Sequence, residues 1–388
     1  MYTRRDFMKL SALFTASAAL PLLQACGKNA AMQPNAPLAI GYLPIVDAAP
    51  LLVAHGKGLF EQHGVAAAKP VLFRSWAGLV EAFLSGQVNL IHVLSPMSVW
   101  MRYGSRAPVR ALMWNHVCGS ALTVRPDVNA LADLQEQTVA IPFWYSIHNI
   151  IVQQMLRQAG LAVVEKNPQA GQVRLTEMPP SDMVAALAAK QIGGFIVTEP
   201  FNALAEAKGV GKILRFSGDI WRDHACCLSM MHDHDIQSRP QWVQNVINAL
   251  VDAAAFAKHH RAETAELLAK QGIRHYTPHD AKVLRAVLQP EPVVWQKYER
   301  TGAIRHADWQ QRRVDFQPFP FQSYSELLVK LLKETHLAGV NTFLHDVQPE
   351  KADRELFDTR FVERALQRDG LMSSFGLQSL QRQETFAL

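Results

Sequence analysis

Cysteine is scarce in this chain, with four among 388 residues. Cys26, Cys118, Cys226 and Cys227 are too few for a disulfide scaffold, and no CxxC or zinc-finger spacing occurs among them. The spacing therefore predicts neither a metal site nor a cofactor. Beyond the first 25 residues no run approaches the about 18 apolar residues of a membrane span, and low-complexity tracts are absent, which excludes collagen-like and disordered classes.

The basic excess is small and partly local. Lys and Arg number 39 against 34 Asp and Glu, a net charge of +5, and residues 1–25 carry three cations against one anion. The composition, 49% hydrophobic and 19% charged, is that of a globular protein whose length predicts more than one domain.

The N-terminus has the pattern of an export signal. Arg4 and Arg5 precede Phe7 and Lys9, and a short apolar run follows over 10–23. This resembles a twin-arginine signal, and residues 23–26 resemble a lipoprotein box in which Cys26 is lipidated. We expect a signal over 1–25, a tether over 26–37 and a periplasmic lipoprotein anchored to the membrane, which argues against a nucleic-acid partner. The alternative is an uncleaved membrane-buried helix.

The body alternates short β-type runs with amphipathic helices. This pattern predicts α/β architecture with parallel-rich sheets in two lobes around a cleft, and a helical C-terminal extension. We expect lobe 1 over 38–125 and 232–388, including the C-terminal helices, and lobe 2 over 126–231. Expected strands are 38–43, 70–73, 89–93, 120–125, 138–142, 173–177, 194–198 and 228–231; expected helices include 75–84, 146–159, 181–189, 200–208, 242–257, 263–269, 279–287 and 324–336.

Helix starts follow strand ends at three places. Asp47 is placed to cap a helix, another helix starts at Ser75, and Ser95 is expected to cap a helix that has Pro96 at its first position. Ligands of such sheets bind beyond the carboxyl ends of strands, where helix N-termini offer free N–H groups.

Several segments together resemble a known family. They are 41–51, 54–60 with Gly64, Ser75-Trp76, 92–97, 198–203, 218–224 and 226–228. In this order they resemble the nitrate/sulfonate/bicarbonate (NitT/TauT) substrate-binding proteins of ABC importers, nearest the nitrate and bicarbonate branch. The resemblance implies a two-lobed periplasmic binding protein fold of type II.

The resemblance also implies roles for particular residues. Trp76 would form a wall of the ligand site, and His148 would donate a hydrogen bond from lobe 2. Helix openings near Asp47, Trp76 and Ser95 would add positive potential. The chain departs from the nitrate pattern in two places, with Cys226 or Cys227 where nitrate binders carry a lysine and Val117 or Cys118 where they carry an amide, and this disfavours nitrate.

Aromatic residues are available to form the site in the absence of this lysine and amide. Phe143, Trp144 and Tyr145 precede His148, and with Trp76 and Trp114 they could box a flat or cationic organic ligand such as a pyrimidine, amine or amide. The complete set of candidate ligand-binding residues is Asp47, Trp76, Ser95, Trp144, Tyr145, His148, Glu199 and Cys227.

Each candidate also has an ordinary structural interpretation. Trp76 could be a core residue, and Glu199 could cap the helix that follows it. His224, the two adjacent cysteines, His232, Asp233 and His234 contain soft metal ligands, but adjacent cysteines in a strand point to opposite faces. Buried, inert thiols are therefore expected.

The sequence thus predicts a solute-binding component of an ABC importer that works with a permease and an ATPase and catalyses nothing. Its ligand would be a nitrate-, bicarbonate- or sulfonate-like anion or a small nitrogenous molecule. One alternative is an exported lipoprotein that senses a ligand for a partner. Another is a pyrimidine-synthase-like enzyme on this fold, using Cys227 and His148; no GxSxG, HExxH, GxxxxGK[ST] or GxGxxG motif supports it.

Overall fold

The computed structural model describes residues 36–306, 309, 312–368 and 370–388. The predicted signal, Cys26 and most of the tether lie outside the described residues. Among the helices of the described ranges, none combines the length and the apolar character needed to cross a membrane.

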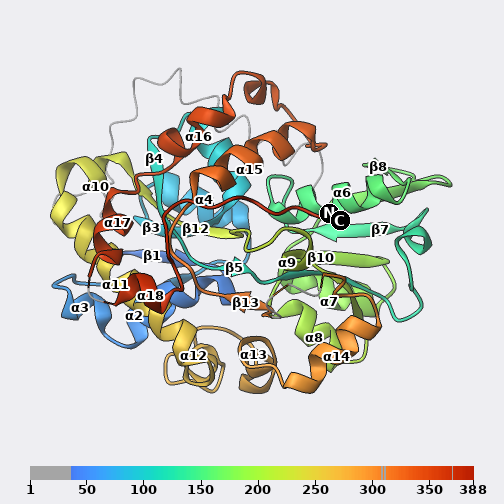
Figure 1. The fold of residues 1–388 in the computed structure, drawn as a ribbon, viewed down its shortest axis with the longest axis horizontal. Coiled ribbons are helices and arrows are strands. Elements are labelled where there is room, and N and C mark those ends of the chain that lie inside the picture. Colours follow the sequence, from blue (N-terminus) through green and yellow to red (C-terminus); the bar gives the residue numbers. More distant parts are fainter. Residues whose placement is uncertain (1–35, 307–308, 310–311, 369) are drawn as a thin grey trace.

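Two sheets lie side by side and form the centres of two lobes (Figure 1). The first sheet pairs its strands in the order β2-β1-β3-β12-β4; β1 is parallel to β2 and β3, and β12 is antiparallel to β3 and β4. The strands are β1 Ile40–Tyr42, β2 Val71–Leu72, β3 Leu90–Leu94, β4 Val109–Trp114 and β12 Cys227–His232.

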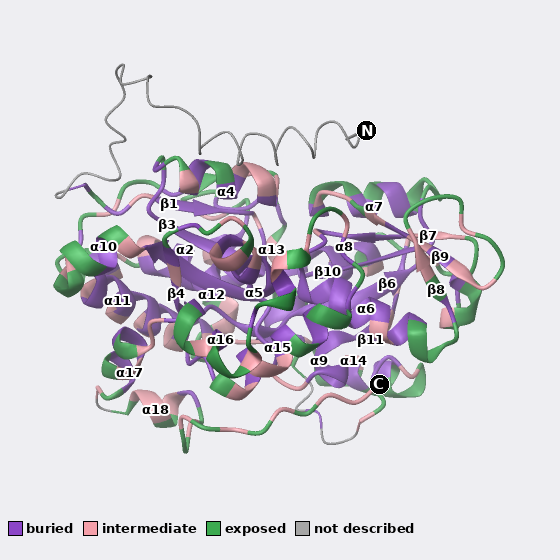
Figure 2. Ribbon diagram, turned by 90° about the horizontal axis from the view of Figure 1, so that it is seen from above, coloured by how far each residue is buried: buried purple, intermediate pink, exposed green. Residues whose placement is uncertain are grey.

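The second sheet has the order β11-β6-β10-β7-β9-β8. Strands β10, β7, β9 and β8 run parallel, and β6 is antiparallel to both β10 and β11. Its strands are β6 Ser120–Val124, β7 Thr138–Ile141, β8 Ala162–Val164, β9 Gln172–Glu177, β10 Gly194–Thr198 and β11 Lys212–Phe216. The central strands of both sheets are buried beneath helices (Figure 2).

The two strands that cross between the lobes correct the expected boundaries. Strand β6 was expected in lobe 1 and β12 in lobe 2, but β6 pairs with β10 and β11 and β12 pairs with β3 and β4. Sheet membership depends on hydrogen-bond partners far away in sequence, which the local pattern of a strand does not encode.

Helices cover both sheets. The helical segments are η3 Val46–Ala48, α2 Ala49–Gly56, α3 Leu59–Gln62, α4 Trp76–Leu84, α5 Ser95–Val99, η4 Trp100–Gly104, η5 Leu131–Leu134, α6 Ile147–Gln158, α7 Pro180–Ala188, α8 Phe201–Ala207, α9 Ser217–Ile220, α10 Asp233–Ser238, α11 Pro240–His259, α12 Arg261–Leu268, α13 Ala281–Leu288, α14 Pro292–Arg300, α15 Gln322–Glu334, η6 Thr342–His345, α16 Pro349–Leu356, α17 Arg360–Leu366 and α18 Leu371–Ser374.

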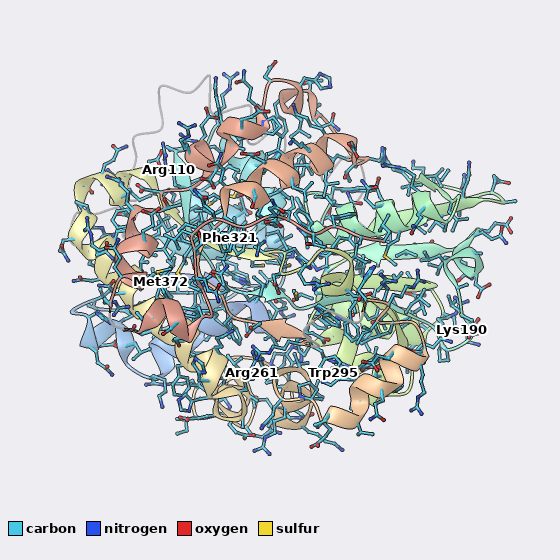
Figure 3. The ribbon with its side chains drawn as sticks, viewed as in Figure 1. Arg110, Lys190, Arg261, Trp295, Phe321 and Met372 are labelled. Atoms are coloured by element: carbon cyan, nitrogen blue, oxygen red, sulfur yellow. The ribbon has the colours of Figure 1, made fainter. Side chains whose placement is uncertain are left out.

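Several C-terminal helices contact elements of lobe 1, with α11 against α2 and with α16 and α17 against β4, whereas α14 packs elsewhere. Its Trp295 and Tyr298 belong to a small apolar cluster with Phe216 of β11, and the Phe216 and Tyr298 rings meet edge to face at 4.8 Å. Figures 1 and 3 show α14 and Trp295 beside the helices of lobe 2. The aromatic face of α14 finds its apolar surface on the second sheet, so this helix ties the C-terminal third to both lobes.

A two-stranded ribbon lies between the sheets, where β5 Val117–Cys118 pairs with β13 Val314–Asp315. The chain turns from β5 into β6 at Gly119, which has a φ of +84°. A Cβ at this glycine would lie 3.1 Å from Nδ1 of His116, so the turn requires both the left-handed backbone and the close approach that glycine allows.

Candidate functional site

A buried group of four side chains lies where the two sheets meet. One ligand-type atom from each of Asp47, His116, Cys226 and Cys227 lies within 4.8 Å of all the others, and all four residues are buried. We name this group the junction cluster. It lies beyond the carboxyl ends of β1, β3 and β10, which is the position where α/β sheets of this kind bind ligands.

Asp47 is the centre of the junction cluster. Its Oδ1 accepts a hydrogen bond from Oγ1 of Thr198, and its Oδ2 lies 3.1 Å from Sγ of Cys227 and 2.9 Å from Nε2 of His116. The expectation that Asp47 caps a helix is wrong, because Ala48 stands at the N-cap of α2 and no side chain caps it. The carboxylate instead joins residues from distant segments.

His116 comes from the segment between β4 and β5 and is fully buried. Nε2 lies 2.9 Å from Oδ2 of Asp47, but within the described part of the chain neither ring nitrogen makes a hydrogen bond. Burial lowers the pKa of His116, but the Asp47 carboxylate outweighs burial and raises it to about 10. Burial likewise opposes ionisation of Asp47, yet His116 and the surrounding hydrogen bonds hold its pKa well below the usual range.

The two adjacent cysteines lie in the same cluster, which corrects the expectation of opposite faces. Cys226 precedes β12 and is not part of its regular pleat, whereas Cys227 is the first residue of the strand. Both sulfurs therefore reach the cluster. Burial raises the pKa of the Cys227 thiol, whereas the Cys227 hydrogen bond and the charge of His148 outweigh burial at Cys226 and lower its pKa.

Lobe 2 contributes Thr198 and His148. Thr198 ends β10, and His148 is the second residue of α6, whose N-cap Ser146 accepts a hydrogen bond from the Asn149 N–H. His148 Nε2 lies 2.9 Å from Oγ of Ser120 and 3.9 Å from Sγ of Cys226. The enzymatic alternative paired His148 with Cys227, but the contact is with Cys226.

Trp76 and Ser95 are the candidates that follow strands of lobe 1. Trp76 begins α4, its ring centre lies 5.4 Å from that of His92, and within the described ranges its Nε1 has no hydrogen-bond partner. The expectation that Ser95 caps its helix is wrong, because Ser95 is the first residue of α5 and Leu94 stands at the N-cap. The Ser95 N–H donates to the Cys226 carbonyl and its hydroxyl donates to the Ala225 carbonyl.

The aromatic residues do not form one box. Trp144 contacts His336, Tyr145 stacks with Phe343, and Trp114 packs edge to face with Phe321 and Tyr324. Their rings are buried in separate contacts, which gives each a packing role.

Glu199 directs both carboxylate oxygens to protein groups. Oε2 accepts a hydrogen bond from the Ala203 N–H in α8, and Oε1 lies 3.0 Å from Nη1 of Arg313. Its side chain therefore caps α8 and pairs with Arg313. Helix capping is the structural interpretation that the sequence offered as the alternative to ligand contact.

Other polar residues around Cys226 lie apart from the junction cluster. His232, at the far end of β12, lies 3.0 Å from the Phe83 carbonyl, and Asp233 pairs with Arg102. His224 Nε2 lies 2.9 Å from Oγ of Ser217, and burial lowers its pKa to about 3. The short spacing along the chain thus does not bring these residues together.

His116 is the main residue that sequence reasoning missed. The resemblance directed attention to Val117 and Cys118 as replacements for an amide, one and two residues beyond it. A polar side chain three residues before Gly119 was the available indication. Thr198 was part of a quoted segment but was not singled out.

Two surface cavities lie elsewhere. One, of about 390 Å³, is lined by residues including Arg110 (labelled in Figure 3), Asp353 and Arg360. The other, of about 620 Å³, is lined by residues including Arg312, Asp315 and Arg382. Neither is lined by a member of the junction cluster.

Comparison with known proteins places this geometry in context. The model of the NMT1-like family matches residues 31–271. The nitrate/nitrite binding protein NrtA of Nostoc sp. is 26% identical over 276 residues, covering 66% of this chain and 61% of the relative. The bicarbonate transport ATP-binding protein CmpC of Synechocystis sp. is 28% identical over 252 residues, covering 60% of this chain and 37% of the relative.

A solved structure shares the fold. The periplasmic nitrate-binding protein NrtA from Synechocystis superposes with a TM-score of 0.72 at 18% identity, covering 90% of this chain and 93% of that one. The two-lobed periplasmic binding protein fold is thereby confirmed, as is the resemblance to the nitrate and bicarbonate group inferred from the sequence segments.

Proposed function

Because the chain belongs to the NMT1-like family, we propose that it is the extracytoplasmic solute-binding component of an ABC importer. It holds one small ligand between its lobes and presents it to a permease driven by an ATPase. The chain spans about three fifths of the length of the NrtA relative and just over a third of CmpC. Their names describe nitrate binding and bicarbonate transport.

The proposal rests on the fact that both lobes supply buried polar side chains to the junction cluster and its surroundings. Asp47, Cys226 and Cys227 belong to the first lobe, and Thr198 and His148 come from the second. Buried polar groups are costly unless they are paired, so a polar set assembled across a lobe junction favours a ligand site. Separation of the lobes would break the bond between Thr198 and Asp47 and expose these groups.

A thermal-shift screen of the purified chain tests this function. Nitrate, bicarbonate, sulfonates, amines and pyrimidines are offered, and a ligand at one hundred times its Kd stabilises the folded chain by about 2.7 kcal/mol. We expect the shift to be lost in His148→Ala and retained in Cys118→Ser, whose buried thiol lies beside Asp223. For an anion or organic ligand, a shift that persists in His148→Ala and in Thr198→Val places the ligand elsewhere and contradicts the proposal.

Export and anchoring belong to the same proposal and derive from the sequence. The twin-arginine signal exports the chain, and Cys26 carries lipid that tethers it to the membrane. Replacement of Arg4 and Arg5 by lysine is expected to retain the precursor inside the cell, and Cys26→Ser is expected to release the exported protein from the membrane fraction. Membrane retention of Cys26→Ser contradicts the lipid anchor.

A further inference from the structure

The donor atoms of the junction cluster indicate the kind of ligand, which the proposed function does not specify. Its donors are one carboxylate oxygen, one imidazole nitrogen and two sulfurs, all within 4.8 Å of one another. We propose that the ligand enclosed by the lobes is a divalent transition metal ion of the zinc class, bound by Asp47, His116, Cys226 and Cys227. This inference rests on the proposed function and names its ligand.

The donor types favour such an ion. Thiolates and imidazole bind zinc and its transition-metal neighbours, whereas magnesium and calcium prefer oxygen alone. Zinc bonds of about 2.0–2.3 Å in a tetrahedron place donor atoms about 3.3–3.8 Å apart. In the structure Oδ2 of Asp47 lies 2.9 Å from Nε2 of His116 and 3.1 Å from Sγ of Cys227. Small outward movements of these side chains would therefore make room for an ion.

A structural ion pair explains only part of the cluster. Pairing of Asp47 with His116 would account for two of the four residues, but it does not require two thiols beside it. Moreover, Nε2 of His116, the ring nitrogen that faces the Asp47 carboxylate, is buried and makes no hydrogen bond in the described ranges. In well-formed interiors such atoms are paired, so the cluster is better suited to an ion than to its own internal contacts.

Neighbouring residues make hydrogen bonds to Asp47 of the kind that orient ligands in a metal site. The Thr198 hydroxyl donates to Asp47 Oδ1, leaving Oδ2 for an ion, and Asn115 Nδ2 donates to the Asp47 carbonyl at 3.3 Å. Supporting hydrogen bonds of this kind orient metal ligands and strengthen binding. Thr198 is therefore a positioning residue, and because it belongs to the second lobe, it links ion affinity to lobe closure.

Cobalt binding tests the inference on the full chain. Titration of metal-free protein with Co²⁺ is expected to show one ion per chain and a thiolate-to-cobalt charge-transfer band, both displaced by Zn²⁺. Cys226→Ser and Cys227→Ser each weaken the band and lower affinity more than about 100-fold, since even supporting residues contribute 10–100-fold. Cys118→Ser, which changes a buried thiol outside the cluster, leaves both unchanged.

Thr198 supplies a graded test. Thr198→Val keeps all four donors, so the charge-transfer band is expected to persist while affinity falls about 10–100-fold, and Thr198→Ser restores it. The wild-type titration alone decides the matter if a cysteine variant fails to fold. Absence of stoichiometric cobalt binding, or of a thiolate band, overturns the inference.

The ligand screen separates this inference from the proposed function. If the chain binds an anion or organic molecule through His148 but no metal, the inference fails and the importer function stands. If cobalt binds with the thiolate band but no ligand or metal changes the separation of the lobes, the metal site stands and the solute-binding function fails.

Discussion

Two buried polar groups lie at the meeting of the lobes, and they differ in the kinds of side chain that they bring together. In the first, Arg313 lies between Glu199 and Glu206, with Nη1 at 3.0 Å from Glu199 and Nη2 at 2.7 Å from Glu206. The Tyr298 hydroxyl completes this Arg313 cluster. In the second, the junction cluster, two thiols and a histidine surround a single carboxylate.

The difference separates a structural role from a ligand role. Two carboxylates around one guanidinium form strong charge-assisted hydrogen bonds, which join α8 to the segment before β13. Burial raises the pKa of Glu199, and Arg313 opposes that rise. The junction cluster instead concentrates soft donors that gain most from an added ion.

The largest effect is expected in the Arg313 cluster. Arg313→Ala leaves the buried Glu199 without a cation, and removal of one partner from such a pair costs about 3–5 kcal/mol. Urea unfolding measures the loss. Arg360→Ala, which removes an exposed arginine paired with Asp358, is the control and should cost less than about 1 kcal/mol. Equal losses of stability in Arg313→Ala and Arg360→Ala would contradict a structural role for the Arg313 cluster.

Acid is expected to destabilise the surroundings of the junction cluster next. Nε2 of His92 accepts a hydrogen bond from the Leu43 N–H at 2.8 Å, and burial lowers its pKa from 6.5 to about 4. Between these values the unfolded chain takes up a proton that the folded chain excludes. The unfolding free energy therefore falls as pH falls through this window, by about 3 kcal/mol from His92.

Unfolding of the wild type and of His92→Gln at pH 7 and pH 4 measures this term. The glutamine can accept the same hydrogen bond but does not titrate, so its loss of stability should be smaller by that amount. An identical pH dependence of the two proteins would show that His92 is not buried as a neutral ring.

A third test removes the bond that joins the lobes at the junction cluster. Thr198→Val deprives Asp47 of a hydroxyl donor and is expected to cost about 2 kcal/mol, since hydrogen bonds to charged groups contribute about 1.5–3 kcal/mol. Denaturant unfolding measures it, and Thr198→Ser should recover most of the loss. Wild-type stability of the valine variant would mean that the hydroxyl does not serve Asp47.

The smallest effect concerns the helix that presents His148. Ser146→Ala removes the N-cap of α6 and is expected to cost about 1 kcal/mol. Ser75→Ala at α4, where Ser75 accepts from the Gly78 N–H, is a matched cap on the first lobe. Only Ser146→Ala should also weaken ligand binding through His148. Equal losses of ligand affinity in Ser146→Ala and Ser75→Ala would contradict a specific role of α6 in binding.

The sequence predicted what depends on local chemistry. The helices expected from Ser75 and Ser146 begin there, because both hydroxyls accept from free N–H groups of the first turn. The caps expected at Asp47 and Ser95 do not form. Alternation of strands and helices indicated two α/β lobes. The resemblance drew attention to Trp76 and His148, and the structure places His148 beside Cys226.

What could not be predicted depends on contacts between distant segments. The sheets of β6 and β12 are decided by strand partners, and α14 packs on lobe 2 through its aromatic face. The junction cluster joins residues near 47, 116 and 226. Spacing rules assume that metal ligands lie close in sequence, so they overlooked His116. The two cysteines were separated because neighbouring residues of a regular strand point to opposite faces.

The central claim is that the lobes enclose a ligand at the junction cluster. Small-angle X-ray scattering of the full chain, with and without the ligand or ion that gives the largest thermal shift, tests it most directly. The account predicts a smaller radius of gyration on binding and no such change in Thr198→Val at the same ligand concentration. An unchanged radius for the fully bound wild type, together with an open apo form, would contradict it.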